Sequence, residues 1–152
     1  MLTRKFKKED FLTEDFIKLV HKRMYSNVWA WAGEFRKTNK NMGADRYQVA
    51  IELRKLLADC NHWIDHGTYP PDEIAVRFKH RIVSIHCFSN GNGRHSSMMG
   101  DLIIEKIFGK PVFTWGAIAD LTKTSDTRKE YLTAVKTADK NDIGPLLEFA
   151  RK

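Results

Sequence analysis

One stretch of the chain combines residue types that can bind a phosphate with one that can move a proton. It reads His86, Cys87, Phe88, Ser89, Asn90, Gly91, Asn92, Gly93, Arg94. Its two glycines can adopt backbone angles closed to other residues, so a ligand can approach the peptide groups closely. A helix that begins directly after them points its free N–H groups and its positive dipole end at the same place. The stretch therefore predicts a phosphate-binding loop.

Two side chains extend the chemistry of this loop beyond binding. Arg94 falls in the first turn of the helix that follows, where a cation is poorly placed unless an anion binds there. His86 ends the preceding helix, and an imidazole titrates near neutral pH, so it can take the proton of an attacking hydroxyl. We predict that His86 is a general base and that Arg94 binds the phosphate.

Each of these residues also has a purely structural interpretation. A histidine after an apolar stripe is commonly a packed core residue, and an isolated Gly-x-Gly is commonly a turn. A simple connection between helices needs roughly 2–8 residues and one glycine. This one has two glycines, two asparagines, a histidine and an arginine in succession, which favours a function. We expect Phe88 to hold the loop to the core and Cys87 to be an inert small residue.

Two amphipathic helices and one apolar helix must position the loop. Apolar residues at three- and four-residue steps predict a helix over about 48–67 and another from Pro70 to the loop. After the loop, apolar residues surround most of a helix that ends before Gly109, so we expect this helix at the centre of the fold.

The remaining elements are also predicted to be helical. Thr13 and the acids after it predict a helix over about 13–25, and two shorter helices are expected at about 127–138 and 143–150. The inward residues of the last two are expected to be Leu132, Val135, Leu146, Leu147 and Phe149. Residues 29–33 and 38–43 indicate a loop or a short hairpin. No repeat or linker divides the chain, so we predict a mostly helical single domain over 1–152.

Composition narrows the classes of function. The chain has 152 residues and a net charge of +7. Its apolar runs fall far short of the ~20 residues that cross a bilayer, and its N-terminus leads into charge, so we expect a cytoplasmic protein without a membrane partner. Cys60 and Cys87 have no ligand-spaced partner, which predicts neither a disulfide nor a zinc site. The basic residues are scattered, so the charge does not indicate nucleic-acid binding.

The loop resembles the signature of the Fic family, His-x-Phe-x-(Asp or Glu)-Gly-Asn-Gly-Arg-x-x-Arg. Residues 29–36, 67–85 and 142–147 look like the Fic branch called mobile mystery protein B, so the resemblance covers nearly the whole chain. It implies an all-α Fic fold, a single helical domain with a small β-hairpin flap near the active site. It also implies a protein adenylyltransferase, which transfers AMP from ATP to a Tyr, Thr or Ser hydroxyl of a target protein.

The resemblance carries roles to individual positions. His86 matches the base, and Arg94 matches the arginine that binds the nucleotide phosphates. Gly91, Asn92 and Gly93 match the anion hole around the α- and β-phosphates.

The segment from about 38 to 46 matches the flap that clamps the target backbone. Its central residues are Lys40, Asn41, Met42 and Gly43.

Two positions depart from the family pattern. Asn90 stands where an acid normally holds Mg²⁺, and an amide oxygen is a poorer ligand for a hard dication than a carboxylate. We expect Mg²⁺ as a cofactor, with Asn90 as its candidate ligand and the bound phosphates supplying much of the coordination. Ser97 stands where a second arginine normally engages the γ-phosphate, so we place Ser97 among the nucleotide-binding residues.

These departures leave other functions open. Relatives with altered loops transfer phosphocholine or act as kinases, and a catalytically weak nucleotide-binding module would also suit Asn90 and Ser97. Gly93 keeps the Gly-Asn-Gly-Arg form, which favours AMP transfer. Family members are often inhibited by a helix carrying (Ser or Thr)-x-x-x-Glu-(Gly or Asn). This chain has no such segment, so we expect a small antitoxin or an inhibitory helix supplied in trans, or an N-terminal extension that this chain lacks.

Overall fold

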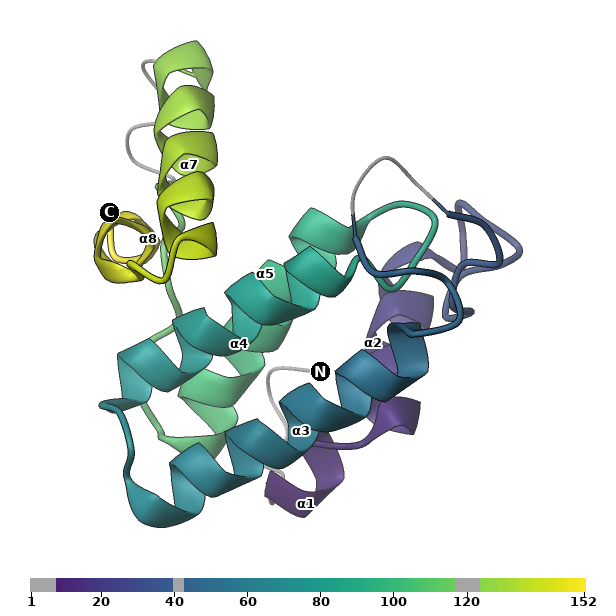
Figure 1. Ribbon diagram of the computed structural model, residues 1–152, viewed down its shortest axis with the longest axis horizontal. Helices are drawn as coiled ribbons and strands as arrows, with labels where there is room; N and C mark the ends of the chain where they lie inside the picture. Colours follow the sequence, from purple (N-terminus) through teal and green to yellow (C-terminus); the bar gives the residue numbers. More distant parts are fainter. Residues whose placement is uncertain (1–7, 40–42, 117–123) are drawn as a thin grey trace.

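Helices form the regular structure of this protein. The computed structural model describes residues 8–39, 43–116 and 124–152 (Figure 1). Its elements in chain order are α1 (Lys8–Phe11), α2 (Glu14–Tyr25), α3 (Val49–His66), α4 (Pro71–Ile85), α5 (Asn92–Leu102), the π-helix η1 (Ile103–Ile107), α7 (Thr124–Asp139) and α8 (Gly144–Ala150). No strand occurs among these residues. The mostly helical fold predicted from the sequence is confirmed.

Local signals in the sequence begin and end the helices around the site. Thr13 caps α2, because its side-chain oxygen accepts the N–H of Phe16 at 3.1 Å. Gly67 ends α3 with a φ of +57°, in the left-handed region that glycine adopts at low cost. Pro71 opens α4, where the backbone N–H that proline lacks would have no helical partner.

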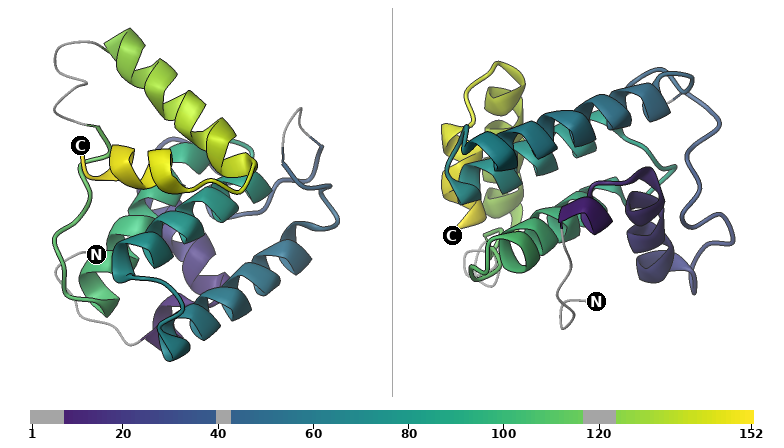
Figure 2. Two further views of the ribbon diagram at one scale, coloured as in Figure 1. Left: turned by 60° about the vertical axis from the view of Figure 1, so that its left-hand side comes forward. Right: turned by 90° about the horizontal axis from the view of Figure 1, so that it is seen from below.

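The core is built around α4 and α5. α4 packs against α3, α5 and α8, and α2 packs against α5, while α7 and α8 pack together at one end of the molecule (Figures 1 and 2). α4, the loop after it, α5 and η1 contribute large, fully buried side chains to this part of the core: Phe78, Phe88, Met99, Leu102, Ile103 and Ile104. The central position predicted for the helix after the loop is therefore confirmed, and the start of α5 is held by densely packed neighbours.

Two details differ from the sequence predictions. Leu132 is 45% exposed, so its predicted inward orientation is wrong. The buried stripe of α7 runs through Ala134 and Ala138, with Tyr131 packed beside it, and Leu132 lies on the next flank of the helix. The short helix α1 was not expected.

The predicted β-hairpin flap is not shown. Lys40, Asn41 and Met42 lie outside the described residues, and at the nearby positions 37–39 and 43–45 the chain has bends at 37, 38, 43 and 44 and no strand. Among the helices that the structure describes, none has the length and apolar content needed to cross a membrane.

Candidate active site

The junction between α4 and α5 is sharply bent at His86. This residue caps α4 with φ +58° and ψ +60°, the left-handed region that a non-glycine residue enters only at a cost of about 1–3 kcal/mol. The turn ends the helix and leaves the His86 side chain half-buried at the wall of a cavity. A strained residue that its surroundings hold in place is typical of a functional site.

This cavity of about 450 Å³ brings together most of the residues predicted from the sequence. Its lining consists of Tyr25, Trp29, His86, Ser89, Asn90, Gly91, Asn92, Gly93 and Arg94. Tyr25 and Trp29 are additions that the sequence did not single out, and they form an aromatic wall opposite the loop, with Trp29 stacked on Trp31 at 4.6 Å. The predicted residues Ser97 and Gly43 lie elsewhere.

The cavity receives the positive end of α5. Gly91 caps this helix with φ +78°, and the N–H of His95 donates to the Gly91 carbonyl at 3.0 Å. The amides of Asn92, Gly93 and Arg94 come before that bond, so helix geometry gives them no acceptor within α5. The first turn carries no acid. An anion in the cavity would therefore find unpaired amides, the helix dipole and the exposed Arg94 guanidinium.

The side chain of Asn92 holds the loop in shape. It is buried, its Oδ1 accepts the N–H of Phe88 at 3.0 Å, and its Nδ2 donates to the Phe88 carbonyl at 2.8 Å. Both bonds stay inside the loop, so Asn92 can offer a ligand only its backbone N–H.

His21 supports the loop from α2. Its Nδ1 accepts the N–H of Gly33 at 2.9 Å, so the ring proton sits on Nε2, which donates to the Asn90 carbonyl at 3.0 Å. The ring also stacks on Phe88 at 3.8 Å. Burial lowers the pKa of His21, which keeps the ring in this neutral form. The sequence did not identify His21, although its place four residues after the buried Ile17 was a signal that it faces inward.

Arg36 joins the flap segment to His86. Its side chain is 4% exposed, and its guanidinium donates to the carbonyls of His86, Ile85, Thr38 and Ala44. The N–H of Ala44 in turn donates to the Ile85 carbonyl at 3.1 Å. The sequence showed Arg36 only as one of the scattered basic residues, because its partners are backbone carbonyls that leave no pattern.

Gly43 places the flap segment directly against the predicted base. A Cβ at this position would lie 2.6 Å from the Cβ of His86 and 2.9 Å from the Ile85 carbonyl oxygen. Only glycine fits there, and its φ of +95° also favours glycine. Gly43 is the single central flap residue among the described ones.

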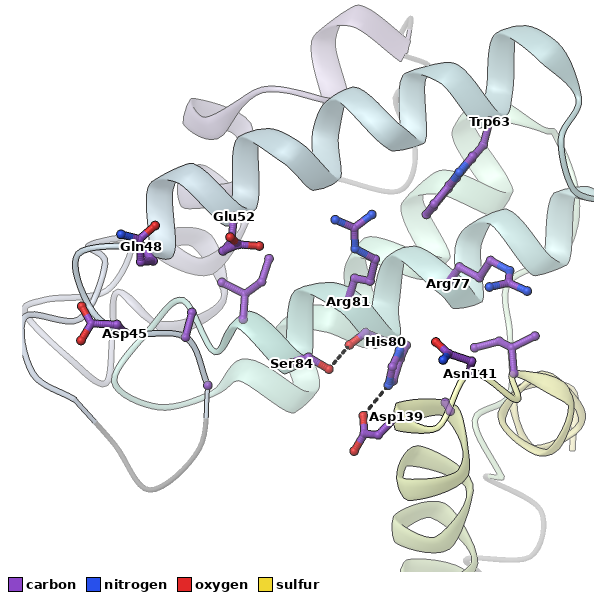
Figure 3. Close-up of a pocket in the computed structure, with 15 residues that line it drawn as sticks. Asp45, Gln48, Glu52, Trp63, Arg77, His80, Arg81, Ser84, Asp139 and Asn141 are labelled. Atoms are coloured by element: carbon purple, nitrogen blue, oxygen red, sulfur yellow. Dashed lines mark hydrogen bonds and ion pairs between the residues drawn. The ribbon is translucent and has the colours of Figure 1, made fainter.

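Figure 3 shows a second cavity, of about 700 Å³, on the outer face of α4. Gly43, Ala44 and Asp45 form one end of it, and the end of α7 forms the other. His80 lies in its wall, with Nε2 2.7 Å from Asp139 Oδ1. Apart from Gly43, none of the predicted site residues that the structure describes lines this groove.

The residues around Asn90 do not form a magnesium site. Asn90 Oδ1, the oxygen expected to bind the metal, accepts the N–H of Gly91 at 2.7 Å. No group of three or more His, Cys, Asp or Glu side chains suited to a metal occurs in the described ranges. Asn90 alone offers one neutral oxygen, which is too little for a hard dication.

Two further side chains in or beside the cavity differ in what they can do. Cys87 is buried, and burial raises the pKa of its thiol to about 12, so it is no nucleophile, as expected. Tyr25 is 9% exposed, its ring blocks any side chain at Gly91, and its hydroxyl has no hydrogen-bond partner among the described residues. A buried hydroxyl without a partner beside a cavity indicates a place for a bound polar group.

A third cavity, of about 780 Å³, adjoins the first, because Gly93 and Arg94 line both. Ser97 lies here, together with the rings of Trp115, Tyr131 and Phe149. Asp101 at its wall accepts the indole N–H of Trp115 at 3.1 Å, which orients that ring. The two cavities offer an anion site and, next to it, an aromatic surface.

Comparison with known proteins identifies relatives of the whole fold. The sequence model of the Fic/DOC family matches residues 11–104, more than half of the chain. The protein adenylyltransferase Fic of Aedes aegypti is 25% identical over 146 residues, which cover 93% of this chain and 28% of that protein. The protein adenylyltransferase fic-1 of Caenorhabditis elegans is 25% identical over 150 residues, 96% of this chain and 28% of that protein. The chain thus spans about 28% of the length of these curated relatives.

Solved structures share the fold. A Fic domain containing signaling protein from Bacteroides thetaiotaomicron superposes with a TM-score of 0.75 at 21% identity, covering 93% of this chain and 59% of that one. Fic-1 (residues 134–508) of C. elegans gives a TM-score of 0.70 at 22% identity, covering 95% and 44%. The finer assignment to the mobile mystery protein B branch stays a prediction.

Proposed function

The chain belongs to the Fic/DOC family, and from that premise we propose that it is a protein adenylyltransferase that moves AMP from ATP to a hydroxyl of a target protein. One observation carries the proposal. The amides at the start of α5 and the side chain of His86 line the same cavity, so a phosphate bound by the amides would lie beside a proton acceptor. The names of the curated relatives support AMP as the transferred group.

The reaction would proceed by direct displacement at the α-phosphate. The hydroxyl oxygen of the target forms a bond to the α-phosphorus, and the bond from that phosphorus to the oxygen bridging the β-phosphate breaks. Pyrophosphate leaves with the electron pair of that bond. His86 takes the hydroxyl proton, while the amides of Asn92, Gly93 and Arg94 stabilise the charge on the phosphate oxygens.

The rest of the nucleotide has room in the adjoining cavity. A purine ring could stack on the aromatic side chains there, and Arg94 at the boundary between the two cavities would hold the phosphates. Ser97 could donate its hydroxyl to the nucleotide from the same wall. Because the residues at Asn90 do not fit Mg²⁺, we assign no step to the metal.

The target would approach over the flap segment. Gly43 and Ala44 lie against His86 and Ile85, so a target backbone bound along residues 38–46 would bring a hydroxyl close to the base. Recognition through the main chain is the usual way in which an extended peptide adds to an exposed segment. Lys40, Asn41 and Met42 stay predicted docking residues, as does control by an antitoxin or an inhibitory helix.

A weak nucleotide-binding module is the second candidate, and one contact favours it. Asn90 Oδ1 already accepts a hydrogen bond from the N–H of Gly91, the amide at the entrance of the anion site. This amide can reach a phosphate only after the Asn90 side chain turns away. A chain in which Asn90 stays in place would bind nucleotide without transferring it.

Labelled ATP separates these functions. The purified chain is incubated, with and without Mg²⁺, with ATP labelled in the adenine and, separately, in the γ-phosphate, and intact mass is measured in parallel. We expect transfer of the adenine label, to an added acceptor protein or to the chain itself, and its loss in His86→Ala. The exposed histidine of α3 provides a matched control, His62→Ala, which should transfer as the wild type does.

Three outcomes would contradict adenylyl transfer by this site. Transfer of the γ-label alone would make the protein a kinase. Adenine transfer at the wild-type level by His86→Ala would remove His86 from the reaction. Nucleotide binding without any transfer, unchanged in Asn90→Asp, would favour the binding module.

A further inference from the structure

A buried amine lies near the phosphate site, within hydrogen-bond distance of Ser96 in α5, the helix after the loop. Lys79 of α4 is 1% exposed. Its Nζ donates to Ser96 Oγ at 2.9 Å and to Tyr131 Oη at 2.8 Å, and it faces the rings of Trp115 and Tyr131 at 5.3 and 5.0 Å. In the described part of the chain, both of its hydrogen-bond partners are neutral hydroxyls. A buried ammonium group without a bonded carboxylate is costly and needs an explanation.

Ser96 connects this amine to the anion site. Its hydroxyl accepts from Lys79 and donates to the carbonyl of Gly93 at 2.6 Å. That carbonyl belongs to the same peptide group as the N–H of Arg94, one of the unpaired amides at the start of α5. A hydrogen bond to the carbonyl fixes the orientation of the peptide and polarises its N–H. Lys79 is therefore two hydrogen bonds away from an amide that faces the phosphate.

The groups around Lys79 can form hydrogen bonds with its Nζ in both protonation states, ammonium and amine. When Nζ is an ammonium group, the Tyr131 oxygen accepts from it, and when Nζ is an amine, the Tyr131 hydroxyl can donate to the nitrogen. The titratable groups that face it are Tyr131 from α7 and Asp101 from α5. Asp101 is occupied by Trp115 and by the N–H of Phe113. Burial lowers the pKa of Lys79 to about 7, against an opposing effect of the Asp101 charge.

A bound polyphosphate would change the equilibrium between the ammonium and amine forms of Lys79. Its negative charge favours the ammonium form of Lys79, and by linkage the ammonium form favours the bound polyphosphate. The dipole of α5 has the opposite effect on Lys79 while the cavity is empty, because its positive end lies at Gly93. Proton uptake and anion binding should therefore occur together.

We propose that Lys79 is a positioning residue of the phosphate site: through Ser96 it holds the Gly93–Arg94 peptide, and it takes up a proton when a polyphosphate binds. This rests on the proposed function only in so far as that function requires a phosphate at the start of α5. It adds a residue that never touches the nucleotide, and it predicts tighter nucleotide binding on the acidic side of neutrality.

Calorimetry with inorganic tripolyphosphate tests the proposal without any transfer reaction. The full chain is titrated near pH 7 in two buffers of different ionisation enthalpy, and the number of protons exchanged is compared between the wild type and Lys79→Met. The difference cancels the titration of the probe itself. We expect the wild type to take up more protons than the variant and to lose affinity about fivefold or more as Lys79 becomes neutral. Equal proton exchange in the two chains would overturn the proposal.

Ser96→Ala tests the connection with a conservative change. The variant loses the hydroxyl that accepts from Lys79 and donates to the Gly93 carbonyl, while Tyr131 still accepts from Lys79. We expect tripolyphosphate to bind about threefold to tenfold more weakly, as for a lost hydrogen bond. Ser84→Ala removes a similar hydroxyl, which donates to the His80 carbonyl of α4 at 2.8 Å, and should leave the affinity unchanged. Wild-type affinity in Ser96→Ala would overturn the role of the relay.

Because Lys79 is buried and its replacement can impair folding, one measurement uses the wild-type chain alone. The ¹³Cε chemical shift of Lys79 reports its protonation from about pH 5 to about pH 9, a range that brackets neutrality. Addition of tripolyphosphate should shift this titration to higher pH, and an unmoved titration would overturn the proposal. Because every readout is binding, failed AMP transfer with normal proton uptake would contradict the proposed function and leave this inference intact.

Discussion

The two sides of the candidate site are built differently. The loop between α4 and α5 is held by the core: Asn92 and His21 bond its backbone, Phe88 is fully buried beneath it, and α5 continues it. Of the flap segment 38–46, the described residues Thr38 and Ala44 are bonded to the rest of the protein by the Arg36 guanidinium and by the Ala44–Ile85 hydrogen bond.

This difference matches what each side would have to bind. The geometry of a nucleotide phosphate is always the same, so a rigid set of amides can be prepared for it in advance. A target protein varies in sequence and shape, and a segment held at few points can adjust to it. Stability is thus expected to be concentrated on the phosphate side and adaptability on the target side.

The largest effect should come from the loop side. Asn92→Ala leaves the N–H and the carbonyl of Phe88 buried without partners, at about 1–3 kcal/mol each. The displaced amides should lower transfer by about 10² or more. Denaturant unfolding and the labelling assay measure both effects. The exposed Asn27→Ala is the control, and an Asn92→Ala chain that keeps wild-type activity would refute the idea of a prepared loop.

Acid should also destabilise the loop side. His95 is buried and its Nε2 donates to the Ile17 carbonyl, and burial lowers the pKa of His95 to about 4 from an ordinary 6.5. Between these two pH values the unfolded chain binds the proton and the folded chain does not, so stability falls as the pH falls. We expect a loss on the order of 3 kcal/mol by about pH 4 in chemical denaturation.

His95→Gln should flatten this pH dependence, because an amide can donate to the same carbonyl without titrating. His66→Gln, on the exposed end of α3, should keep the wild-type profile. The same acid dependence in His95→Gln would place the sensitive group elsewhere.

A smaller and more selective effect is expected at the joint between the two sides. Arg36→Met removes the bonds to Thr38 and Ala44 on the flap side and those to Ile85 and His86 at the end of α4, so the flap segment should lose its place beside His86. We expect transfer to a target protein to fall about tenfold, or about 1.4 kcal/mol, while tripolyphosphate binding changes much less. Arg54→Met is the matched control, since Arg54 lies exposed on α3, away from both sides of the site, with a single ion pair to Glu14 at 3.8 Å. If both binding and transfer fell equally, the two sides would not be separable.

The smallest effect concerns the aromatic wall. Tyr25→Phe removes only the hydroxyl that has no partner in the described protein. Its loss should leave the free energy of unfolding unchanged or raise it by about 1 kcal/mol, and should weaken tripolyphosphate binding about twofold to tenfold if a phosphate is the missing partner. Tyr47→Phe, at the exposed ring beside Arg46, serves as the control. Unchanged binding in Tyr25→Phe would show that the hydroxyl does not contact the anion.

The sequence predicted which residues come together where neighbours in the chain are neighbours in space, while their catalytic and binding roles stay predictions. His86 and residues 90–94 are contiguous, and a glycine-containing junction between two amphipathic helices allows few arrangements, so they line one cavity as expected. Helix ends were predictable for the same reason, since caps such as Thr13 and Gly67 act within one turn.

The sequence did not reveal two buried cations, because their hydrogen-bond partners form no recognisable pattern along the chain. Arg36 bonds only backbone carbonyls, and Lys79 bonds hydroxyls brought close by folding, so both looked like ordinary surface cations. The predicted orientation of Leu132 was wrong for another reason. Successive residues of a helix are rotated by about 100°, so an apolar residue next to the buried face is easily assigned to that face.

The nine-residue motif depends on residues outside it, namely the imidazole of His21 and the guanidinium of Arg36, so it would not keep its structure when moved alone into another protein. Grafted between two helices of an unrelated scaffold, residues 86–94 would keep their glycines and their arginine. They would lack the ring that holds the Asn90 carbonyl and the cation that holds the His86 carbonyl, both of which come from residues some fifty to seventy positions earlier in the chain. A designer who wishes to transplant the candidate site must therefore carry α2 and the segment after it along with the motif.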